Sequence, residues 1–310
     1  MDELDRLIIT ELQHDPRQSI KKLSQTIGVA KDTIRRRIDN LVSSETLILT
    51  ALPNLNVLGY PVRVIIWIDA ECSKIEEIAN QLCQMPFIGF VSYSIGSGKL
   101  YIRGNFPSTL SMINFITDRL GRIEGILFID TMIEFEEIKR VNIRLGMPQL
   151  YRQEVPQIAQ IEINKNDIFL IRKLQKDARA SLKELAQYIG VSQMTIHRRI
   201  QELVNSGTIE FTAILNTDKI GYPAICNARV QTKPAQIRHV ADKIAEFPQI
   251  HYVGIISGPG QLLIGIHSPS IETISDFLTH ELNKIDGVVK VESFSFLKIL
   301  KQTFTWLSEK

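Results

Sequence analysis

The sequence is poor in cysteine, carries almost no net charge and contains no long apolar run. Three cysteines stand among 310 residues, and neither their odd number nor their spacing suits a disulfide framework or a zinc site. We therefore expect Cys72, Cys83 and Cys226 to be free thiols and the chain to hold no metal. No apolar stretch approaches membrane-spanning length, and residues 1–5 are acidic where a targeting leader would be basic. These absences predict a cytoplasmic protein with no membrane partner.

The charge balance excludes a chain that is basic throughout. Lysine and arginine number 36 against 34 acidic residues, which leaves a net charge of +2. Any affinity for nucleic acid must then come from local clusters of basic residues. The 44% hydrophobic content is that of a soluble globular protein, and the length predicts roughly two to three domains.

One basic cluster follows a glycine turn within residues 27–41. Ile34, Ile38 and Leu41 share one face of a predicted helix, whereas Arg36 lies on the opposite face. Arg36 is the middle of three consecutive arginines, which would repel one another in a free helix. An anionic neighbour such as a phosphate backbone would favour this arrangement. A solvated helix face is the other interpretation.

The same stretch occurs again at residues 189–203, with the apolar positions and two of the arginines retained. Matching residues lie 162 positions apart, and the two copies align without gaps from about residue 4 to about residue 138. The matched pairs are Asp5 and Asp167, Gly28 and Gly190, Gly59-Tyr60-Pro61 and Gly221-Tyr222-Pro223, Pro86 and Pro248, Gly96 and Gly258, and Gly125 and Gly287. The chain is therefore predicted to be a duplicated two-domain unit, and the repetition favours nucleic-acid binding over a solvated face.

Each copy begins with three short helices, and a glycine turn precedes the third. This is the pattern of a helix-turn-helix domain whose third helix contacts DNA. Ser19 and Ser192 are predicted N-caps, whereas Ala30 leaves the third helix of the first copy without a side-chain cap. Residues 181–184 are predicted to form a capping box. A strand at residues 46–52 follows, either as a wing or as a link.

The remainder of each copy has the order strand, helix, strand, strand, helix, strand. In the first copy the strands are expected at 61–70, 87–95, 99–106 and 126–138, and the helices at 74–83 and 108–122. This order is the ferredoxin-like arrangement, an antiparallel sheet with both helices on one face. The predicted fold class is α+β, with each copy a (winged) helix-turn-helix domain followed by a ferredoxin-like βαββαβ domain.

The domain boundaries follow from this order. The first copy comprises a helix-turn-helix domain at 1–53 and a ferredoxin-like ligand or assembly domain at 54–138. Residues 139–164 form an extended linker. The second copy comprises a helix-turn-helix domain at 165–215 and a ferredoxin-like domain at 216–301, and residues 302–310 form a C-terminal tail.

The open face of each sheet is expected to need a cover. Trp67, Phe90, Phe128 and Phe135 cannot all point at the helices, because alternate positions of a strand face opposite sides. A second sheet is the natural cover, and the repeat supplies one. We expect self-association through the sheet domains, either of the two copies as a covalent pseudo-dimer or of each copy with its counterpart in another chain.

With this order of elements, the chain resembles the Lrp/AsnC family, the feast/famine transcription regulators of bacteria and archaea. The likeness rests on an ordered set that occurs twice: Asp5, Leu23, Gly28, Thr33, Ile34, Arg37, Ile38, Leu41, Gly59-Tyr60, Gly96 and Gly125, and Asp167, Leu185, Gly190, Thr195, Ile196, Arg199, Leu203, Gly221-Tyr222, Gly258 and Gly287. It covers nearly the whole chain apart from the linker and the tail. Family members usually form dimers and often octamers, bind DNA with the third helix, and take amino acids or related small molecules at contacts between sheet domains.

The resemblance implies a sequence-specific transcription regulator that binds double-stranded DNA. The candidate DNA-binding residues are Lys31, Asp32, Thr33, Arg35, Arg36 and Arg37 in the first copy and Gln193, Met194, Thr195, His197, Arg198 and Arg199 in the second. The arginines at 35, 36 and 198 can contact either phosphates or bases. Asp32 can accept from a cytosine amino group and Met194 can meet a thymine methyl, so the half-sites need not be identical. We expect an imperfectly palindromic operator.

The resemblance also implies a small-molecule effector bound near the hairpins of the two sheets. The candidate effector-binding residues are Gly96, Gly98 and Lys99 in the first copy and Gly258, Gly260 and Gln261 in the second. The family commonly has an aspartate three positions after the hairpin glycine, where this chain has Lys99 and Gln261. This departure argues against an amino-acid effector held by its ammonium group.

An enzyme is the alternative, because siroheme decarboxylases resemble the same family and sometimes occur as fusions of two units. Their sheet domain carries histidines and arginines for tetrapyrrole carboxylates. Residues 87–106 of this chain offer Arg103 and no histidine, and His251 and His267 are expected to be isolated strand or rim residues. No carboxylate pair, triad, phosphate-cradling loop or metal-ligand spacing stands out. The sequence therefore predicts no catalytic residue and no cofactor.

Overall fold

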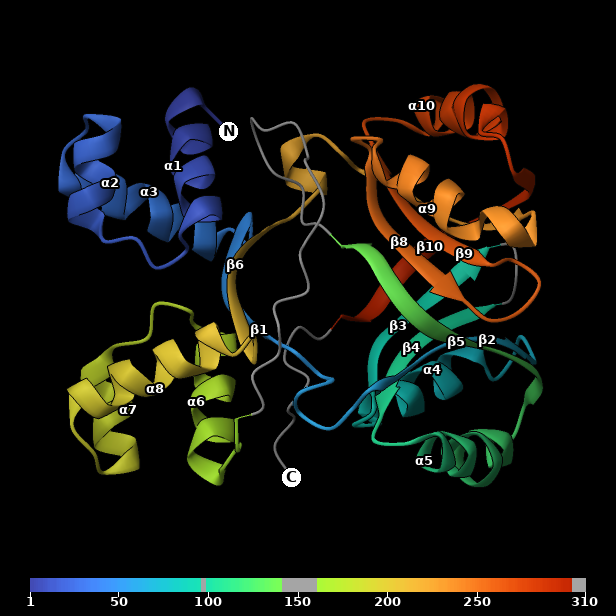
Figure 1. The fold of residues 1–310 in the computed structure, drawn as a ribbon, viewed down its shortest axis with the longest axis horizontal. Coiled ribbons are helices and arrows are strands. Elements are labelled where there is room, and N and C mark those ends of the chain that lie inside the picture. The colour runs from blue at the N-terminus through green and yellow to red at the C-terminus, as the bar shows by residue number, and fades with distance from the viewer. Residues whose placement is uncertain (96–98, 141–160, 303–310) are drawn as a thin grey trace.

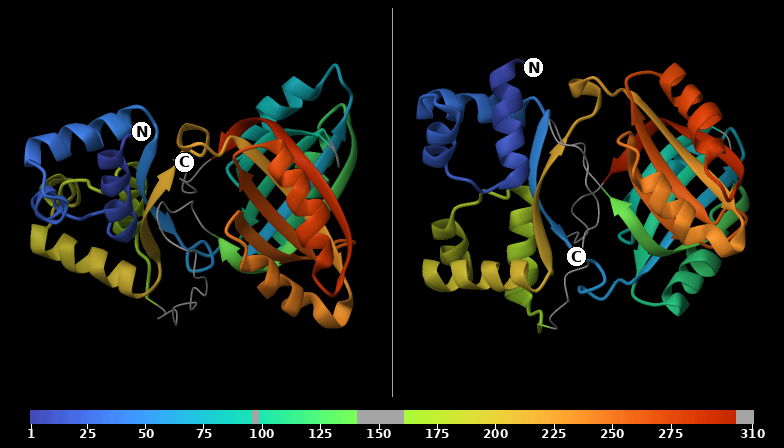
Figure 2. Two further views of the ribbon diagram at one scale, coloured as in Figure 1. Left: turned by 90° about the horizontal axis from the view of Figure 1, so that it is seen from above. Right: turned by 45° about the horizontal axis from the view of Figure 1, so that its top comes forward.

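The computed structural model describes residues 1–95, 99–140 and 161–302. Helix-turn-helix domains lie on one side of the molecule, and a β-barrel with helices on its outside lies on the other (Figures 1 and 2). We call the described residues of 1–140 half 1 and those of 161–302 half 2. The centre of the predicted linker, residues 141–160, and the tail from residue 303 lie outside the described residues.

Each half starts with the predicted helix-turn-helix domain. Half 1 has α1 (Glu3–His14), α2 (Ile20–Ile27) and α3 (Lys31–Ser43), and half 2 has α6 (Lys165–Lys176), α7 (Leu182–Ile189) and α8 (Gln193–Asn205). Gly28 and Gly190 end α2 and α7 with φ angles of 77° and 79°, a left-handed conformation that costs glycine nothing. The turn thereby directs the apolar face of the following helix into the domain core.

The helix caps agree with the sequence in part. Ser19 and Ser192 accept hydrogen bonds from the backbone of α2 and α8, as predicted. The expected capping box at residues 181–184 is wrong, because the exposed Ser181 side chain makes no cap hydrogen bond within the described part of the chain. The sequence analysis missed the capping boxes that do form. They pair Asp2 with Asp5 at the start of α1, and Asn164 with Asp167 at the start of α6.

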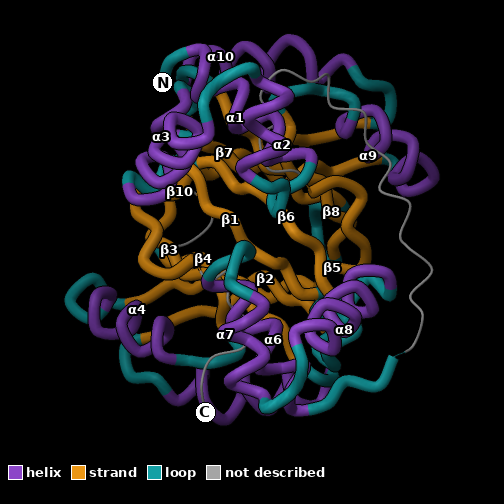
Figure 3. Tube along the Cα trace, turned by 90° about the vertical axis from the view of Figure 1, so that its left-hand side faces the viewer, coloured by secondary structure: helices purple, strands orange, loops and turns teal. Residues whose placement is uncertain are grey.

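A two-stranded ribbon joins the helix-turn-helix domains. β1 (Leu47–Pro53) pairs antiparallel with β6 (Ile209–Leu215), and Thr50 lies opposite Thr212. β1 is therefore the link between the halves, with β6 as its partner. The ribbon lies between the two domains when the molecule is viewed from their side (Figure 3). Each domain core also includes residues of the other half, because α1 packs on β6 and α6 packs on β1.

The ferredoxin-like domains follow with the predicted order of elements. Half 1 contributes β2 (Val62–Ala70), α4 (Ile75–Gln84), β3 (Ile88–Ile95), β4 (Leu100–Phe106), α5 (Thr109–Asn114) and β5 (Ile126–Arg140). Half 2 contributes β7 (Ala224–Thr232), α9 (Ile237–Ala245), β8 (Ile250–Ile256), β9 (Leu262–Ser268), α10 (Ile271–Asp276) and β10 (Val288–Gln302). None of the helices in the described residues is long and apolar enough to cross a membrane.

The two sheets join at both edges and close a barrel in the order β10-β3-β4-β2-β5-β8-β9-β7. The halves therefore pair within one chain as a pseudo-dimer. The joints are the antiparallel pairs β5–β8 and β3–β10, which we call the charged seam and the apolar seam after the side chains described below. Among the described strands, closure leaves the barrel itself without a free edge, since each terminal strand of one sheet pairs with the other.

The faces of the two sheets that turn toward each other bury part of the expected aromatic set. Trp67 is buried between the sheets and Phe90 packs beside it. The expectation is wrong for Phe128 and Phe135, whose exposed fractions are 62% and 67%. Pairing shifts register between Glu134 and the residue two positions later, so Phe135 falls on a bulge and points outward.

Candidate nucleic-acid interface

The helix-turn-helix domains form the end of the molecule opposite the barrel and face the viewer in Figure 3. On α3 the side chains of Asp32 and Arg35 have exposed fractions of 99% and 65%. On α8 Met194 is 74% exposed and the Arg198 side chain 76%. Further candidates are also accessible: Lys31, Arg36, Gln193, Thr195 and His197 are exposed, and Thr33 is half-buried. Each recognition helix thus presents a polar face with exposed cationic side chains to solvent, and two of these lie near an acid on their own helix: Arg35 is 4.0 Å from Asp32, and Arg198 is 3.7 Å from Glu202.

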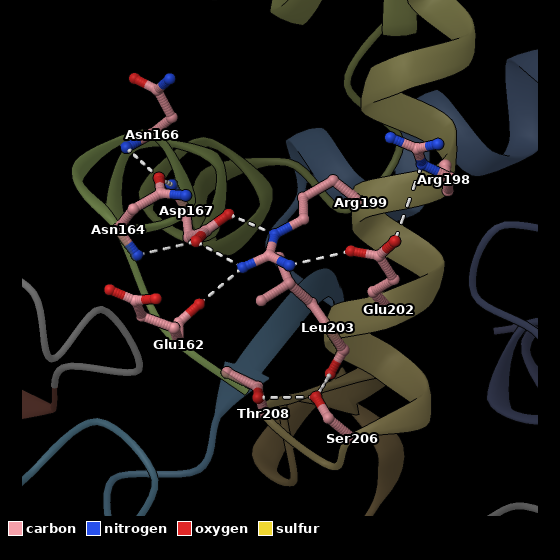
Figure 4. A network of polar contacts seen from close by, with 10 residues as sticks. All are labelled: Glu162, Asn164, Asn166, Asp167, Arg198, Arg199, Glu202, Leu203, Ser206 and Thr208. Atoms are coloured by element: carbon pink, nitrogen blue, oxygen red, sulfur yellow. Dashed lines mark hydrogen bonds and ion pairs between the residues drawn. The ribbon is translucent and has the colours of Figure 1, made fainter. Parts of the chain in front are cut away.

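Two of the predicted DNA-binding arginines hold the domains together instead. Arg37 lies 2.7 Å from Asp2 and 3.2 Å from Asp5. Arg199 makes more contacts, among them those with Asp167 at 2.7 Å and Glu202 at 2.8 Å (Figure 4). Because these guanidinium groups are turned back onto the first helix of their own domain, we leave Arg37 and Arg199 out of the proposed DNA contacts.

The electrostatics support this division. The hydrogen bond to Asp2 raises the pKa of Arg37, and the hydrogen bond to Asp167 raises the pKa of Arg199. The Asp167 side chain is only 1% exposed, so Arg199 compensates a buried charge. Arg199 also donates to the backbone carbonyl of Glu162, just before α6 (Figure 4). The Asp5–Asp167 match in the repeat was a signal for this role, since an acid at the third position of the first helix recurs in both copies.

Contacts between the halves fix the separation of α3 and α8. The buried hydroxyl of Thr50 in β1 donates to the Gln175 carbonyl at the end of α6, over 2.8 Å. The backbone N–H of Ala178 donates to the Leu49 carbonyl over 3.1 Å. Lys219 reaches back from half 2 to the carbonyl of Ser44 at the end of α3. The recognition helices are therefore parts of one packed unit and would address two points of a duplex at a set distance.

The hairpin residues predicted to bind an effector are in part occupied. Lys99 donates to the Ala70 carbonyl over 2.6 Å, and the Gln261 side chain accepts from the Thr232 backbone over 2.7 Å. Gly258 has a φ of 99°, which suits its place in the turn between β8 and β9. A side chain at Gly260 would meet Arg229, since its Cβ would lie 2.9 Å from that of Arg229. Gly96 and Gly98 lie outside the described residues.

A second polar cluster, which the sequence analysis missed apart from Arg103, lies inside the charged seam. The Glu134 side chain is 1% exposed, and its carboxylate forms ion pairs with Arg63 and Arg103, each at 2.8 Å. Tyr252 donates its hydroxyl to the same carboxylate from half 2, over 2.6 Å. Burial alone would raise the pKa of Glu134, but the surrounding arginines and this hydrogen bond lower it to about 2. Glu134 therefore stays ionised in the barrel.

The expectation that His251 and His267 are isolated is wrong. Their ring centroids lie 4.0 Å apart beside the charged seam, because a bulge at His251 turns its ring toward β9. The absence of a side chain at the neighbouring Gly265 makes room for the His251 ring, since a Cβ at Gly265 would lie 2.4 Å from that ring. Burial lowers the pKa of His267 to about 4 and holds the pKa of His251 well below its usual value. Within the described residues, no group of three potential metal ligands forms around this pair.

The fold and the exposed helices define a duplicated helix-turn-helix protein with two ferredoxin-like sheet domains. The family model for the AsnC-type helix-turn-helix domain matches residues 1–42 and 164–204, and the model for the Lrp/AsnC ligand binding domain matches residues 224–306. The helix-turn-helix transcriptional regulator LrpA of Pyrococcus horikoshii is 31% identical over 140 residues, which cover 45% of this chain and 99% of that protein. The regulator FL11 of the same organism is 31% identical over 46% of this chain and 95% of its own. The chain belongs to the Lrp/AsnC family.

Among solved structures, likeness over the whole chain is found with the siroheme decarboxylase NirDL. Its TM-score is 0.71 at 15% identity, over 97% of this chain and 93% of that one. A second structure of NirDL, in complex with an iron-uroporphyrin III analogue, gives a TM-score of 0.70 at 14% identity. At this identity the likeness shows that the two proteins share a fold, with two helix-turn-helix units and two sheet domains in one chain.

Proposed function

We propose that this chain is a transcription regulator that places α3 and α8 on one double-stranded operator. The observation that carries the proposal is the pair of exposed basic helix faces held at a fixed separation by the β1–β6 ribbon. The curated relatives are named as helix-turn-helix transcriptional regulators, which supports the same activity. One chain then supplies both halves of the binding unit that single-copy regulators obtain by pairing two chains.

The proposed contacts fall into two groups. Arg35, Arg36 and Arg198 supply exposed guanidinium groups for the phosphate backbone or for guanine. Asp32 and Met194 stand at equivalent positions of the two helices and differ in chemistry, as a hydrogen-bond acceptor and an apolar group. The two halves of the operator should therefore differ in sequence.

The binding experiment is a fluorescence-anisotropy titration of the chain on DNA from upstream of its own gene, at several salt concentrations. Arg36→Ala and Arg198→Ala should each weaken binding and reduce the slope of log affinity against log salt by about 1. The matched control is Arg122→Ala, which removes an exposed arginine from a sheet domain. Binding by both recognition-helix variants that equals wild type would overturn the proposal.

The small-molecule effector remains part of the proposal because half 2 matches the Lrp/AsnC ligand binding domain. Lys99 and Gln261 replace the aspartate that would hold an ammonium group, and each is hydrogen-bonded to the backbone of a neighbouring strand, Lys99 to the Ala70 carbonyl and Gln261 to the Thr232 N–H. An effector for this chain should therefore be recognised without a salt bridge from its amino group to the protein. The test is to measure DNA affinity in the presence of amino acids and, separately, of anionic metabolites. We expect amino acids to leave the affinity unchanged.

The enzyme alternative rests on the whole-chain likeness to NirDL and on the paired histidines beside Arg103 and Arg140. Against it, the space between the sheets is filled by the buried side chains of Trp67, Tyr101 and Tyr252. Arg103 is also engaged by Glu134 and stacked on the Tyr252 ring at 4.7 Å. Addition of siroheme with no change in its absorption spectrum would favour the regulator, whereas a spectral shift followed by decarboxylation would establish the enzyme.

A further inference from the structure

The two seams that close the barrel are equivalent position by position. In the charged seam Glu134 lies opposite Ile256, and in the apolar seam Phe296 lies opposite Ser94. Members of these pairs are 162 positions apart, the same offset that relates the two copies of the sequence. A perfect two-fold axis would make the seams identical. Any difference between them therefore reports divergence of the halves at the surface where they meet.

The interiors of the seams differ in chemistry at the same place. The charged seam is closed by the hydrogen bond from Tyr252 to the buried Glu134, over 2.6 Å. The equivalent residues of the apolar seam are Phe90 and Phe296, whose ring centroids lie 5.0 Å apart. Tyr101 adds a third ring, 4.9 Å from that of Phe296. One seam thus joins a carboxylate to a phenol, and the other joins two phenyl rings.

The rims of the seams differ by a reversal of charge. In the charged seam the acid is on the strand and the base on the helix, and Glu136 of β5 pairs with Arg238 of α9 at 2.5 Å. The equivalent residues of the apolar seam are Lys298 on β10 and Glu76 on α4. The strand therefore carries the positive charge there and the helix the negative one. The two rims therefore carry opposite charges on strand and helix, with the signs reversed between the seams.

A pairing of like halves would lose these matches. Two copies of half 1 would bring Glu136 to Glu76 and would set the buried Glu134 against Phe90. Two copies of half 2 would bring Lys298 to Arg238, and the Tyr252 hydroxyl would face a phenyl ring without its acceptor. Like charges repel, and a buried polar group without a partner costs free energy, so both pairings are disfavoured at each of their two seams.

Other seam contacts are shared and cannot discriminate. Lys139 in the charged seam donates to the Phe247 carbonyl after α9, over 3.0 Å. Its equivalent, Lys301 in the apolar seam, donates to the Met85 carbonyl after α4, also over 3.0 Å. Any combination of halves would keep these contacts. These lysine contacts therefore add affinity to every pairing, and the differences between pairings reside in the residues described above.

We propose that the divergent seams form a recognition surface by which half 1 binds half 2 and rejects a second copy of itself. The partner that each sheet surface fits is the opposite half of this chain, whether the two are covalently joined or not. Specificity of this kind arises from unfavourable contacts in the wrong complex as much as from favourable ones in the right complex. The inference concerns assembly and does not depend on DNA binding.

The experiment uses the full chain with a protease site placed between residues 141 and 160 and cleaved after folding. The cleaved complex is unfolded in urea, refolded and weighed by native mass spectrometry, since the two halves differ in mass. We expect pairs of half 1 with half 2 almost exclusively. Pairs of like halves in the proportions that random pairing gives would overturn the proposal.

The matched variant is Glu136→Lys with Arg238→Glu, which exchanges the charges of an exposed pair. Opposite charges then face each other at the rim in every combination of halves, so pairs of like halves should increase about tenfold over the wild-type level. An unchanged distribution would show that the rim charges carry no recognition and would contradict the proposal.

A second measurement on the intact chain covers the case in which the cleaved halves do not refold. Arg238→Ala removes the attraction to Glu136, whereas Arg238→Glu places an acid there, as a second half 1 would. Arg238→Glu should melt at a lower temperature than Arg238→Ala, and the added change Glu136→Lys should return the melting temperature to near that of wild type. Equal melting temperatures of the two single variants would overturn the proposal.

Discussion

Tyr252 donates a 2.6 Å hydrogen bond to the Glu134 carboxylate across the joint between the two halves of the barrel. The two residues lie 118 positions apart in the sequence and on different sheets. Glu134 is buried, and its carboxylate is bound by two arginines of half 1. The phenol of half 2 supplies a further hydrogen-bond donor to the same carboxylate. This contact ties the stability of one sheet to the presence of the other.

Removal of this hydroxyl should destabilise the chain. Tyr252→Phe leaves a buried carboxylate short of one donor, and loss of a hydrogen bond to a charged group costs about 1.5–3 kcal/mol. Urea unfolding measures the loss. The control is Tyr93→Phe, which removes a half-buried phenol outside this cluster. Equal losses in the two variants would show that the bond to Glu134 contributes nothing specific.

The ionisation of Glu134 should make stability fall in acid. Its pKa is held at about 2 in the folded chain, against an ordinary value of 4.5. A depressed pKa contributes stability that is complete above the unfolded value and is lost as the pH falls toward the folded value. The difference in unfolding free energy between wild type and Glu134→Gln should therefore shrink from about pH 4.5 to about pH 2. A difference that is constant across this range would contradict the assigned pKa.

The two anchoring arginines should differ in their effect on stability. Arg199→Ala uncovers an aspartate that is 1% exposed, and a broken buried ion pair costs about 3 kcal/mol. Arg37→Ala should cost less, because Asp2 and Asp5 are 50% and 13% exposed. Thermal unfolding of both variants is compared with Arg198→Ala, whose side chain is 76% exposed. An Arg198→Ala variant as unstable as Arg199→Ala would remove the distinction between anchoring and DNA-facing arginines.

The two recognition helices should prefer different bases. Asp32→Ala should relax the base preference of one half-site and Met194→Ala that of the other, because an acceptor and an apolar group suit different bases. Selection of binding sites from random duplexes, with wild type and each variant, measures the preference at every position. A perfect inverted repeat selected by the wild-type chain would contradict the prediction.

Patterns in the sequence were sufficient for the domain types and for their order along the chain. The 162-residue offset, the glycine turns at Gly28 and Gly190 and the order of strands and helices predict both domain types, since each rests on spacing within a few turns or strands. The same patterns could not separate Arg36, which is exposed, from Arg37, which is anchored. Adjacent residues of a helix point 100° apart, and only the position of α1 decides which of them meets an acid.

The charged seam had a weaker signal. The residues of its buried polar cluster are far apart in the sequence, and no local period connects them. They are Arg63, Arg103, Glu134 and Tyr252. A comparison of equivalent positions would have shown that Glu134 stands where the other copy has Phe296, and Arg103 where it has Gly265. Such a comparison indicates that the copies diverged on the strands, though not which residues meet.

The sequence by itself determined that this protein is a tandem of two helix-turn-helix units with ferredoxin-like domains, because turns and periodicity are local properties of the chain and the repeat is found by aligning its two halves. Only the tertiary structure decided that the two sheets close one barrel, that β1 pairs with β6, and that a carboxylate of one half is completed by a phenol of the other. Those contacts join residues more than a hundred positions apart, and their free energy depends on burial, which no stretch of sequence possesses until the chain has folded.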